Sequence, residues 1–160
     1  MSLPHRHTLI GGVAGSGKSG VVNVVLANLA ACADAVVWGV DLKGGMELQP
    51  WASYLDRLAT TPADAARLLA DAVNVLEARA ASLAESGVRL WKPAPHAPAL
   101  VVLIDKYAEL AEETRYATTH ADSIARRGRA VAVTLLAATQ RPTQQAMGSG
   151  AVRSQMDVRI

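Results

Sequence analysis

Short, almost uninterrupted apolar segments alternate with longer helical segments along this chain of 160 residues. We expect strands over residues 8–10, 35–40, 99–104, 130–138 and 156–160. The spacing of apolar residues predicts helices over 18–31 and 61–86, and one or two more that run to residue 127. A strand that is apolar on both sides belongs in a parallel sheet covered on both faces. The pattern therefore predicts an α/β fold, with a mainly parallel sheet and helices on both faces.

The long helix over 61–86 has recognisable ends. Thr61 can cap its N-terminus, Pro62 suits its first turn, and Asp64 faces the free amide groups there. Gly87 can adopt the left-handed conformation that commonly ends a helix. We therefore expect this helix to begin and end close to these residues.

Length and composition are those of one folded domain, which we assign to residues 1–160. Apolar residues make up 51% and charged residues 19%, which excludes a disordered chain. No apolar run reaches the ~18 residues of a membrane helix. Cys32 is the only cysteine and the N-terminus lacks the apolar stretch of a signal peptide, so we expect a cytoplasmic protein. Residues 1–7 are expected to be flexible, with His5 and His7 in solvent.

The net charge of +2 is unevenly distributed. Residues 1–114 carry 9 basic and 12 acidic side chains, whereas residues 115–160 carry 7 arginines and 2 aspartates. An arginine-rich region is typical of a nucleic-acid contact. A solvated face with subunit contacts explains the same charge equally well.

Residues 12–19 read Gly-Val-Ala-Gly-Ser-Gly-Lys-Ser and fit the pattern G-x-x-x-x-G-K-[ST]. They follow a predicted strand and precede a predicted helix, so backbone N–H groups and the helix N-terminus would face phosphate oxygens. Lys18 would reach the β- and γ-phosphates, and the Ser19 hydroxyl would bind Mg²⁺. The predicted nucleotide-binding residues are Gly12, Ala14, Gly15, Ser16, Gly17, Lys18, Ser19 and Gly20.

Polar residues follow three of the other predicted strands. Asp105 ends an apolar strand and is placed like the second magnesium-binding acid of phosphate-binding folds, with helix capping as the alternative. Gln140 can contact the γ-phosphate or satisfy its own turn. Asp41 begins the segment Asp-Leu-Lys-Gly-Gly-Met-Glu, which by itself indicates a turn with a charged rim.

Several segments, taken in their order and spacing, resemble the FtsK/SpoIIIE family of hexameric DNA translocases. These segments are 12–19, 41–45, 103–110, 125–130, 138–142 and 150–160. The segment Asp-Leu-Lys-Gly-Gly-Met-Glu is similar to the plasmid-transfer (conjugation) branch, in which TraB-type motors move double-stranded DNA between cells. The glycine-rich loop is generic, but its combination with Ala-Thr-Gln-Arg-Pro is specific.

The resemblance implies a RecA-like P-loop NTPase core, ATP and Mg²⁺ as cofactors, and a homo-oligomeric ring around double-stranded DNA. It implies that the strand ending at Thr139 lies between those ending at Gly12 and Asp105. Lys18, Asp105 and Gln140 are then the predicted catalytic residues, with Gln140 as γ-phosphate sensor, and Ser19 and Asp105 hold Mg²⁺. The candidates for DNA contact or a subunit interface are Arg126, Arg127, Arg129, Arg141 and Arg153.

Lys106 departs from the family pattern, in which a glutamate follows the strand-terminal aspartate. That glutamate polarises the attacking water, and losing a positioned general base costs about 10²–10⁴ in rate. A lysine cannot accept the proton unless it is strongly desolvated, and it can instead pair with Asp105 or with the γ-phosphate. We therefore expect ATP binding with slow hydrolysis.

The resemblance stops at Ile160, inside a predicted strand, whereas the family's motor domain continues with further strands. We therefore expect a partial motor core, truncated at its C-terminal end, with a parent protein that can be anchored at the inner face of the cell membrane. Two alternatives remain. One is the FtsK-like ATPase of a type VII protein-secretion system, which residues 139–142 and the basic last third disfavour. The other is a non-hydrolysing regulatory subunit, which Lys106 favours.

Overall fold

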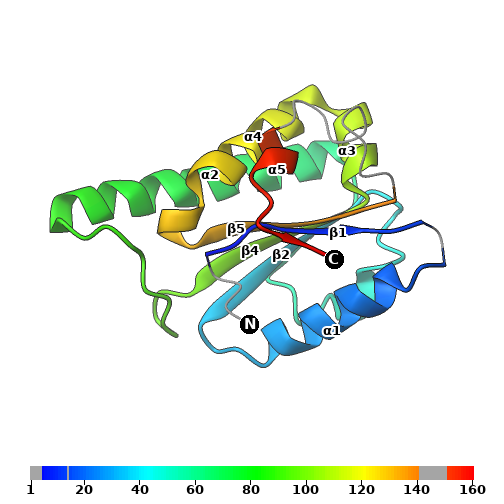
Figure 1. The fold of residues 1–160 in the computed structure, drawn as a ribbon, viewed down its shortest axis with the longest axis horizontal. Helices are drawn as coiled ribbons and strands as arrows, with labels where there is room; N and C mark the ends of the chain where they lie inside the picture. The colour runs from blue at the N-terminus through cyan, green and yellow to red at the C-terminus, as the bar shows by residue number, and fades with distance from the viewer. Residues whose placement is uncertain (1–4, 14, 141–150) are drawn as a thin grey trace.

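A computed structural model describes residues 5–13, 15–140 and 151–160. Helices and strands alternate along the chain, as the apolar pattern predicts (Figure 1). In chain order the elements are β1 (Thr8–Gly11), α1 (Lys18–Ala30), β2 (Ala35–Asp41), the 3₁₀ helix η1 (Gln49–Trp51), β3 (Arg57–Ala59), α2 (Pro62–Ser86), β4 (Ala99–Asp105), α3 (Tyr107–Glu113), α4 (Arg115–Arg127), the 3₁₀ helix η2 (Arg129–Val131), β5 (Val133–Thr139), α5 (Ala151–Ser154) and β6 (Val158–Arg159).

The strands form one parallel sheet in the order β3-β2-β4-β5-β1-β6. Every residue of β4 and of β5 is buried, so the predicted cover on both faces is confirmed. β5 lies between β4 and β1, as the resemblance implies. Asp41 and Asp105 are paired in register at the ends of β2 and β4, so both side chains leave the sheet at the same edge.

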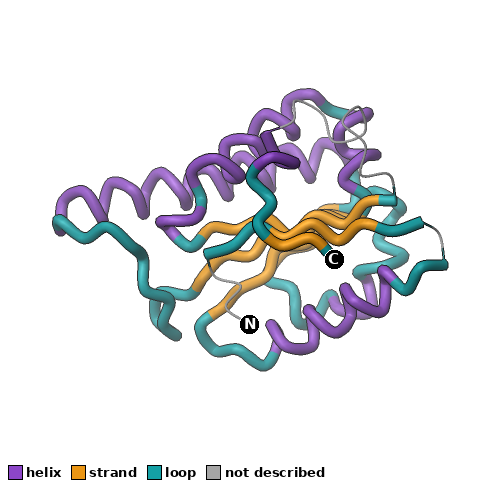
Figure 2. Tube along the Cα trace, in the orientation of Figure 1, coloured by secondary structure: helices purple, strands orange, loops and turns teal. Residues whose placement is uncertain are grey.

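Helices cover the two faces of the sheet unequally. α1 lies on one face, and α2, α3, α4 and α5 lie on the other (Figures 1 and 2). Under α1, Val22, Leu26 and Leu29 join one apolar cluster with side chains of the central strands. The opposite cluster is larger and contains the buried side of α2, including Leu68, Leu69 and Leu76. This two-sided core holds the loops at the carboxyl edge of the sheet in place.

The predicted ends of the long helix are confirmed. The Thr61 hydroxyl accepts a hydrogen bond from the Asp64 amide at 3.2 Å, and Pro62 occupies the first turn. Gly87 ends α2 in the left-handed conformation, with φ of 66°. The capping residues in the sequence therefore predicted both ends of α2 correctly.

Three expectations are wrong. The sheet has six strands rather than five, because β3 adds a short edge strand beside β2. Residues 130–132 are not strand: η2 and a left-handed Ala132 precede β5. His7 is completely buried rather than solvated, because the chain just before β1 already packs against β5. His5 is also engaged, since its Nδ1 lies 2.8 Å from the Arg129 carbonyl oxygen.

Candidate nucleotide-binding site

The glycine-rich loop after β1 and the polar residues after β4 and β5 meet at the carboxyl edge of the sheet. They line one cavity of about 500 Å³. The lining residues are Val13, Gly15, Gly17, Lys18, Ser19, Lys43, Glu47, Asp105, Lys106 and Gln140. Open parallel sheets place their ligands at this edge, because the loops that follow the strands converge there. Residues that lie far apart in the sequence thus line one cavity, as the motifs predicted.

The backbone of the loop favours glycine at two positions. Gly15 and Gly17 have φ of 79° and 85°, a conformation that residues with a Cβ rarely adopt. A Cβ atom on Gly12 would lie 2.2 Å from the Ser16 hydroxyl oxygen, so the Ser16 side chain would have to move to make room for it. The Gly12 amide also donates to the Thr139 carbonyl oxygen at 3.2 Å, which ties the loop to the end of β5.

The remaining predicted loop residues take different places. Gly20 lies in the first turn of α1 and does not line the cavity. Gly12 lines a neighbouring cavity together with Gln140. Ala14 lies outside the described residues, as does Arg141. Lys18 and Ser19 form the first turn of α1, so the N-terminus of a 13-residue helix opens into the cavity.

Asp105 and Lys106 lie side by side at the end of β4. Their side chains are 9% and 10% exposed, and Lys106 Nζ lies 3.9 Å from Asp105 Oδ2. Burial raises the pKa of Asp105 to about 6; the charge of Lys106 opposes this shift, whereas Asp41 and Glu47 add to it. Asp105 Oδ2 has no hydrogen-bond partner among the described residues. This oxygen is therefore a buried acceptor that faces a cation and lacks a hydrogen bond.

Two residues of the cavity were not predicted. Lys43 and Glu47 come from the loop between β2 and η1, which the sequence indicated only as a charged turn. Lys43 Nζ lies 3.8 Å from the Glu109 carboxylate. The Ser19 hydroxyl donates to Glu47 Oε2 at 3.3 Å. The signal was the segment Asp-Leu-Lys-Gly-Gly-Met-Glu, but its spacing alone does not show which cavity the loop faces.

The cavity is positively charged overall. Among the described residues that line it, three lysines face two carboxylates. Positive side chains and a helix N-terminus favour an anionic ligand at the same point. The arrangement is therefore suited to the phosphates of a nucleotide.

Three of the predicted arginines, Arg126, Arg127 and Arg129, are not among the described residues that line this cavity. Arg126 and Arg127 end α4 and are exposed, and Arg129 lies in η2, just before β5 begins. They are thus at the opposite edge of the sheet from the carboxyl ends of the strands. Arg129 is engaged within the fold, since its Nη2 lies 2.8 Å from Asp157 Oδ1 and donates to the Gln155 carbonyl oxygen. Arg153 lies in α5.

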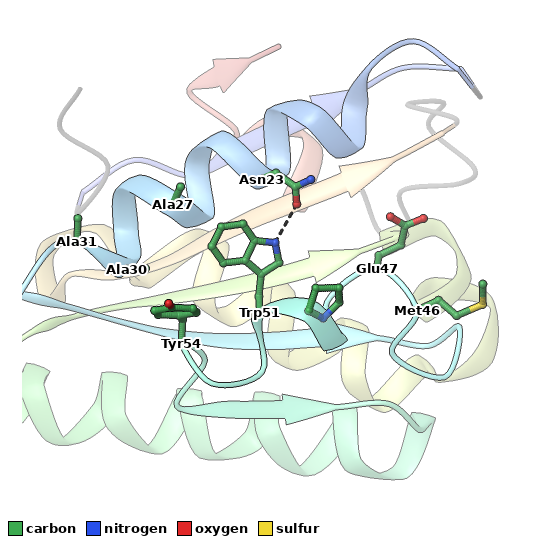
Figure 3. Close-up of a pocket in the computed structure, with 9 residues that line it drawn as sticks. Asn23, Ala27, Ala30, Ala31, Met46, Glu47, Trp51 and Tyr54 are labelled. Carbon is green, nitrogen blue, oxygen red and sulfur yellow. Dashed lines mark hydrogen bonds between the residues drawn. The ribbon is translucent and has the colours of Figure 1, made fainter.

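A second, larger cavity of about 850 Å³ runs along α1. Figure 3 shows Trp51 and Tyr54 beside Asn23, with Trp51 Nε1 donating to Asn23 Oδ1 at 2.9 Å. Among the described residues, those that line it include Glu47 at one end but no lysine or arginine. The smaller cavity, which three described lysines line, is therefore the better candidate for binding phosphate groups.

The described part of the chain contains no group of three or more His, Cys, Asp or Glu side chains that could hold a metal ion by themselves. None of its helices is long and apolar enough to cross a membrane. The candidate site therefore consists of the glycine-rich loop with separate carboxylates around it.

Comparison with known proteins shows the family of the chain. The model of the FtsK/SpoIIIE family matches residues 2–97. The chain belongs to this family. It is 43% identical over 98 residues to a sporulation regulatory protein of Streptomyces azureus, a match that covers 59% of this chain and 32% of the relative. The family match includes the glycine-rich loop and Glu47, whereas Asp105 and Gln140 lie beyond it.

Solved structures extend the similarity over the whole chain. The monomer form of the pCW3 conjugation coupling protein TcpA with ATPγS superimposes with a TM-score of 0.85 at 25% identity, over 99% of this chain and 49% of TcpA. The cytoplasmic domain of the type VII secretion ATPase EccC of Thermomonospora curvata has a TM-score of 0.75 at 24% identity, over 96% of this chain and 20% of EccC, which is a likeness of fold. The chain spans half or less of the length of these relatives.

Proposed function

We propose that this chain binds ATP in the cavity at the carboxyl edge of the sheet and serves as the core of a ring-forming motor that moves double-stranded DNA. The observation that carries the proposal is the meeting of Lys18 and Ser19 with Asp105 and Gln140 around one positively charged cavity. Family membership supports ATPase chemistry in general. The similarity to a conjugation coupling protein supports DNA as the substrate.

Mg²⁺ fits the residues present. Carboxylate and hydroxyl oxygens are the ligands that Mg²⁺ prefers, and Asp105 Oδ2 is a buried acceptor without a hydrogen bond in the described structure. Ser19 and Asp105 would hold the ion, which when bound neutralises charge on the phosphate oxygens. Lys18 and the loop amides bind the phosphates, and Gln140 contacts the γ-phosphate from the end of β5.

Lys106 makes hydrolysis slow in this proposal. It stands where a carboxylate would polarise the attacking water, and its ammonium group is already paired with Asp105. A protonated lysine has no lone pair with which to take a proton from water. The chain is therefore suited to binding ATP more than to rapid turnover.

Nucleotide binding is tested by titrating the protein with a fluorescent ATP analogue in Mg²⁺. Lys18→Ala is expected to weaken binding at least tenfold, because it removes charge-assisted hydrogen bonds from the lysine to the phosphates. Lys92→Ala removes the same charge from an exposed loop and is expected to have no effect. Equal affinity of the wild type and Lys18→Ala would contradict the assignment of the site.

DNA binding is tested by fluorescence anisotropy with two unrelated duplexes of equal length. Contacts to the backbone predict similar affinities for both duplexes and a steep loss between 50 and 200 mM salt. Replacing Arg126 and Arg127 by alanine should lower the salt slope by about one per arginine, and Arg89→Ala is the matched control, an exposed arginine outside the basic region. Binding of one sequence only, insensitive to salt, would contradict the proposal. Absence of duplex binding would favour the secretion class of ATPase.

A further inference from the structure

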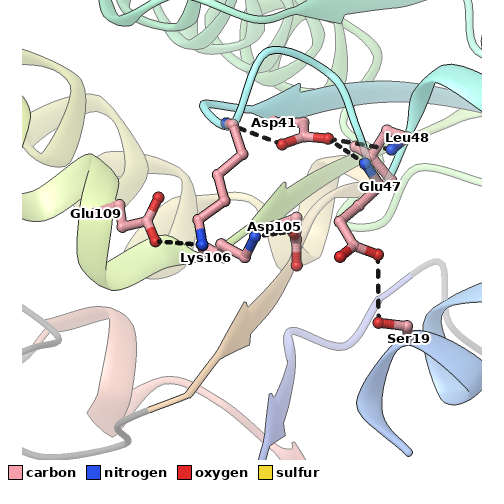
Figure 4. Close-up of polar contacts among 8 residues, drawn as sticks. Ser19, Asp41, Glu47, Leu48, Asp105, Lys106 and Glu109 are labelled. Carbon is pink, nitrogen blue, oxygen red and sulfur yellow. Dashed lines mark hydrogen bonds and ion pairs between the residues drawn. The ribbon is translucent and has the colours of Figure 1, made fainter. Parts of the chain in front are cut away.

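The Ser19 hydroxyl, the predicted magnesium ligand of the loop, contacts a carboxylate that no motif assigned. Ser19 Oγ donates to Glu47 Oε2 at 3.3 Å, and both residues line the phosphate cavity (Figure 4). Ser19 belongs to the first turn of α1, whereas Glu47 follows β2, 28 residues later. The contact therefore depends on how the loop after β2 folds.

Asp41 folds that loop. It is 1% exposed, and its two carboxylate oxygens accept hydrogen bonds from three amides of the loop. Oδ1 accepts from Lys43 at 3.1 Å, and Oδ2 accepts from Glu47 at 2.8 Å and from Leu48 at 3.1 Å. Leu48 is completely buried, so the chain is anchored immediately after Glu47 as well.

The Glu47 side chain has no structural task that explains its position. It is exposed, and it forms no ion pair among the described residues. Its amide is held by Asp41 and the next residue, Leu48, is buried, so the fold of the loop is explained without the Glu47 side chain. The carboxylate is nevertheless directed at the Ser19 hydroxyl.

Resting on the proposed function, we propose that Glu47 is a positioning residue that holds the Ser19 hydroxyl for Mg²⁺. A hydroxyl has one proton and two lone pairs. When Glu47 accepts the hydrogen bond from the Ser19 hydroxyl, the lone pairs of the hydroxyl oxygen are left for a cation in the cavity. Asp105 Oδ2 forms no hydrogen bond among the described atoms, and its ion pair with Lys106 is long at 3.9 Å, so this oxygen can contact the same cation. Partners of this kind orient ligands, and their loss typically costs about 10–100-fold in metal affinity.

The test measures how much Mg²⁺ tightens binding of ATPγS, as the ratio of dissociation constants in EDTA and in Mg²⁺. Glu47→Ala should lower this ratio by about 10-fold or more. Glu47→Gln keeps a hydrogen-bond acceptor without the charge and should retain most of the ratio. Ser19→Ala should bring the ratio close to one, because the hydroxyl ligand is gone. The double variant Ser19→Ala/Glu47→Ala should have the same ratio as Ser19→Ala, because the two groups act as a unit.

Glu85→Ala is the matched control, since it removes an exposed carboxylate at the end of α2. Thermal unfolding confirms that each variant is folded. A wild-type ratio for Glu47→Ala, with nucleotide bound normally, would overturn this inference and leave the proposed function standing. Equal losses in Glu47→Gln and Glu47→Ala would overturn it too, because charge alone would then explain the effect. Failure of the wild type to bind ATPγS would overturn both proposals.

Discussion

Lys106 combines an unusual backbone with an unusual neighbour. Its φ of 60° and ψ of 54° are left-handed, a conformation that costs roughly 1–2 kcal/mol for a residue with a Cβ. Its carbonyl oxygen accepts hydrogen bonds from the Glu109 and Leu110 amides in the first turn of α3, at 2.9 and 3.4 Å. The strained residue thus turns the chain from β4 into α3 and directs its side chain at Asp105.

Lys106→Glu is expected to raise the rate of ATP hydrolysis. The substitution keeps the backbone position and supplies a carboxylate that can polarise water, a contribution of about 10²–10⁴ in rate. The measurement is steady-state phosphate release at saturating ATP and Mg²⁺, with and without duplex DNA. We expect a gain of at least tenfold over the wild type.

Lys106→Gln separates the two effects of the lysine. It removes the positive charge beside Asp105 but adds no base, so turnover should stay at the wild-type level. Comparable rates for the wild type and Lys106→Glu would show that Lys106 does not limit hydrolysis. A gain in Lys106→Gln equal to that in Lys106→Glu would place the defect in the ion pair with Asp105.

The sequence predicted those cavity residues that lie at the end of a strand or directly after it. Asp105 and Gln140 follow apolar strands of a parallel sheet, so both had to emerge at the edge that carries the glycine-rich loop. Glu47 was not predicted, because its position depends on three backbone hydrogen bonds to a buried aspartate six residues earlier. A loop that folds around a buried carboxylate in this way has no periodic pattern in the sequence.

Gly128 forms the tight joint between α4 and the segment that leads into β5. A Cβ atom there would lie 2.0 Å from the Val133 carbonyl oxygen and 2.7 Å from that of Ile124. The Gly128 carbonyl accepts hydrogen bonds from Val131 and Val133, at 3.2 and 3.0 Å, so the backbone cannot retreat without breaking them. Its φ of −73° suits any residue, and the constraint is therefore purely steric.

Gly128→Ala is expected to destabilise the fold by about 3 kcal/mol, the upper end of the cost of overpacking. Gly20→Ala is the control: it lies inside α1 with open space around its Cβ, and should stabilise the chain by roughly 0.5–1 kcal/mol. Urea unfolding followed by circular dichroism measures both. Equal midpoints for Gly128→Ala and the wild type would refute the steric argument.

The elements that the sequence missed are those without a pattern of their own. β3 has only three residues and begins with an arginine, so no alternation or apolar run marks it. It forms because β2 offers an open edge, and Arg57 packs over the Trp38 ring at 4.7 Å. Residues 130–132 are apolar enough for a strand, yet the turn built by Gly128 requires η2 there.

The two ends of the described chain meet at β1. The His7 carbonyl accepts hydrogen bonds from Asp157 and Val158, at 3.0 and 3.3 Å, just before β1 and β6 pair. On the other side, the Leu135 amide of β5 donates to His7 Nδ1 at 3.0 Å. One completely buried histidine thus joins β5, β1 and the segment that leads into β6.

The free energy of unfolding should decrease as the pH is lowered, because the buried His7 stays neutral in the folded chain. Burial lowers its pKa to about 4, and the charge of Arg129 adds to this. Below about pH 6.5 the unfolded chain binds a proton that the folded chain excludes. The free energy of unfolding therefore decreases from pH 6.5 to 4, by up to about 3 kcal/mol for this shift. Asp105 acts in the opposite direction, since its pKa is raised to about 6 and protonation relieves a buried charge.

A comparison of variants isolates the histidine from Asp105. His7→Asn keeps an acceptor for the Leu135 amide but does not titrate, so its free energy of unfolding should fall less than that of the wild type between pH 7 and 4.5. His96→Asn removes an exposed histidine and should leave the wild-type pH dependence unchanged. Urea unfolding at half-unit steps of pH gives the three curves. Parallel curves for the wild type and His7→Asn would mean that His7 does not set the pH dependence. A steeper wild-type curve means that protonation of His7, which contacts β5 and the segment that leads into β6, destabilises the fold.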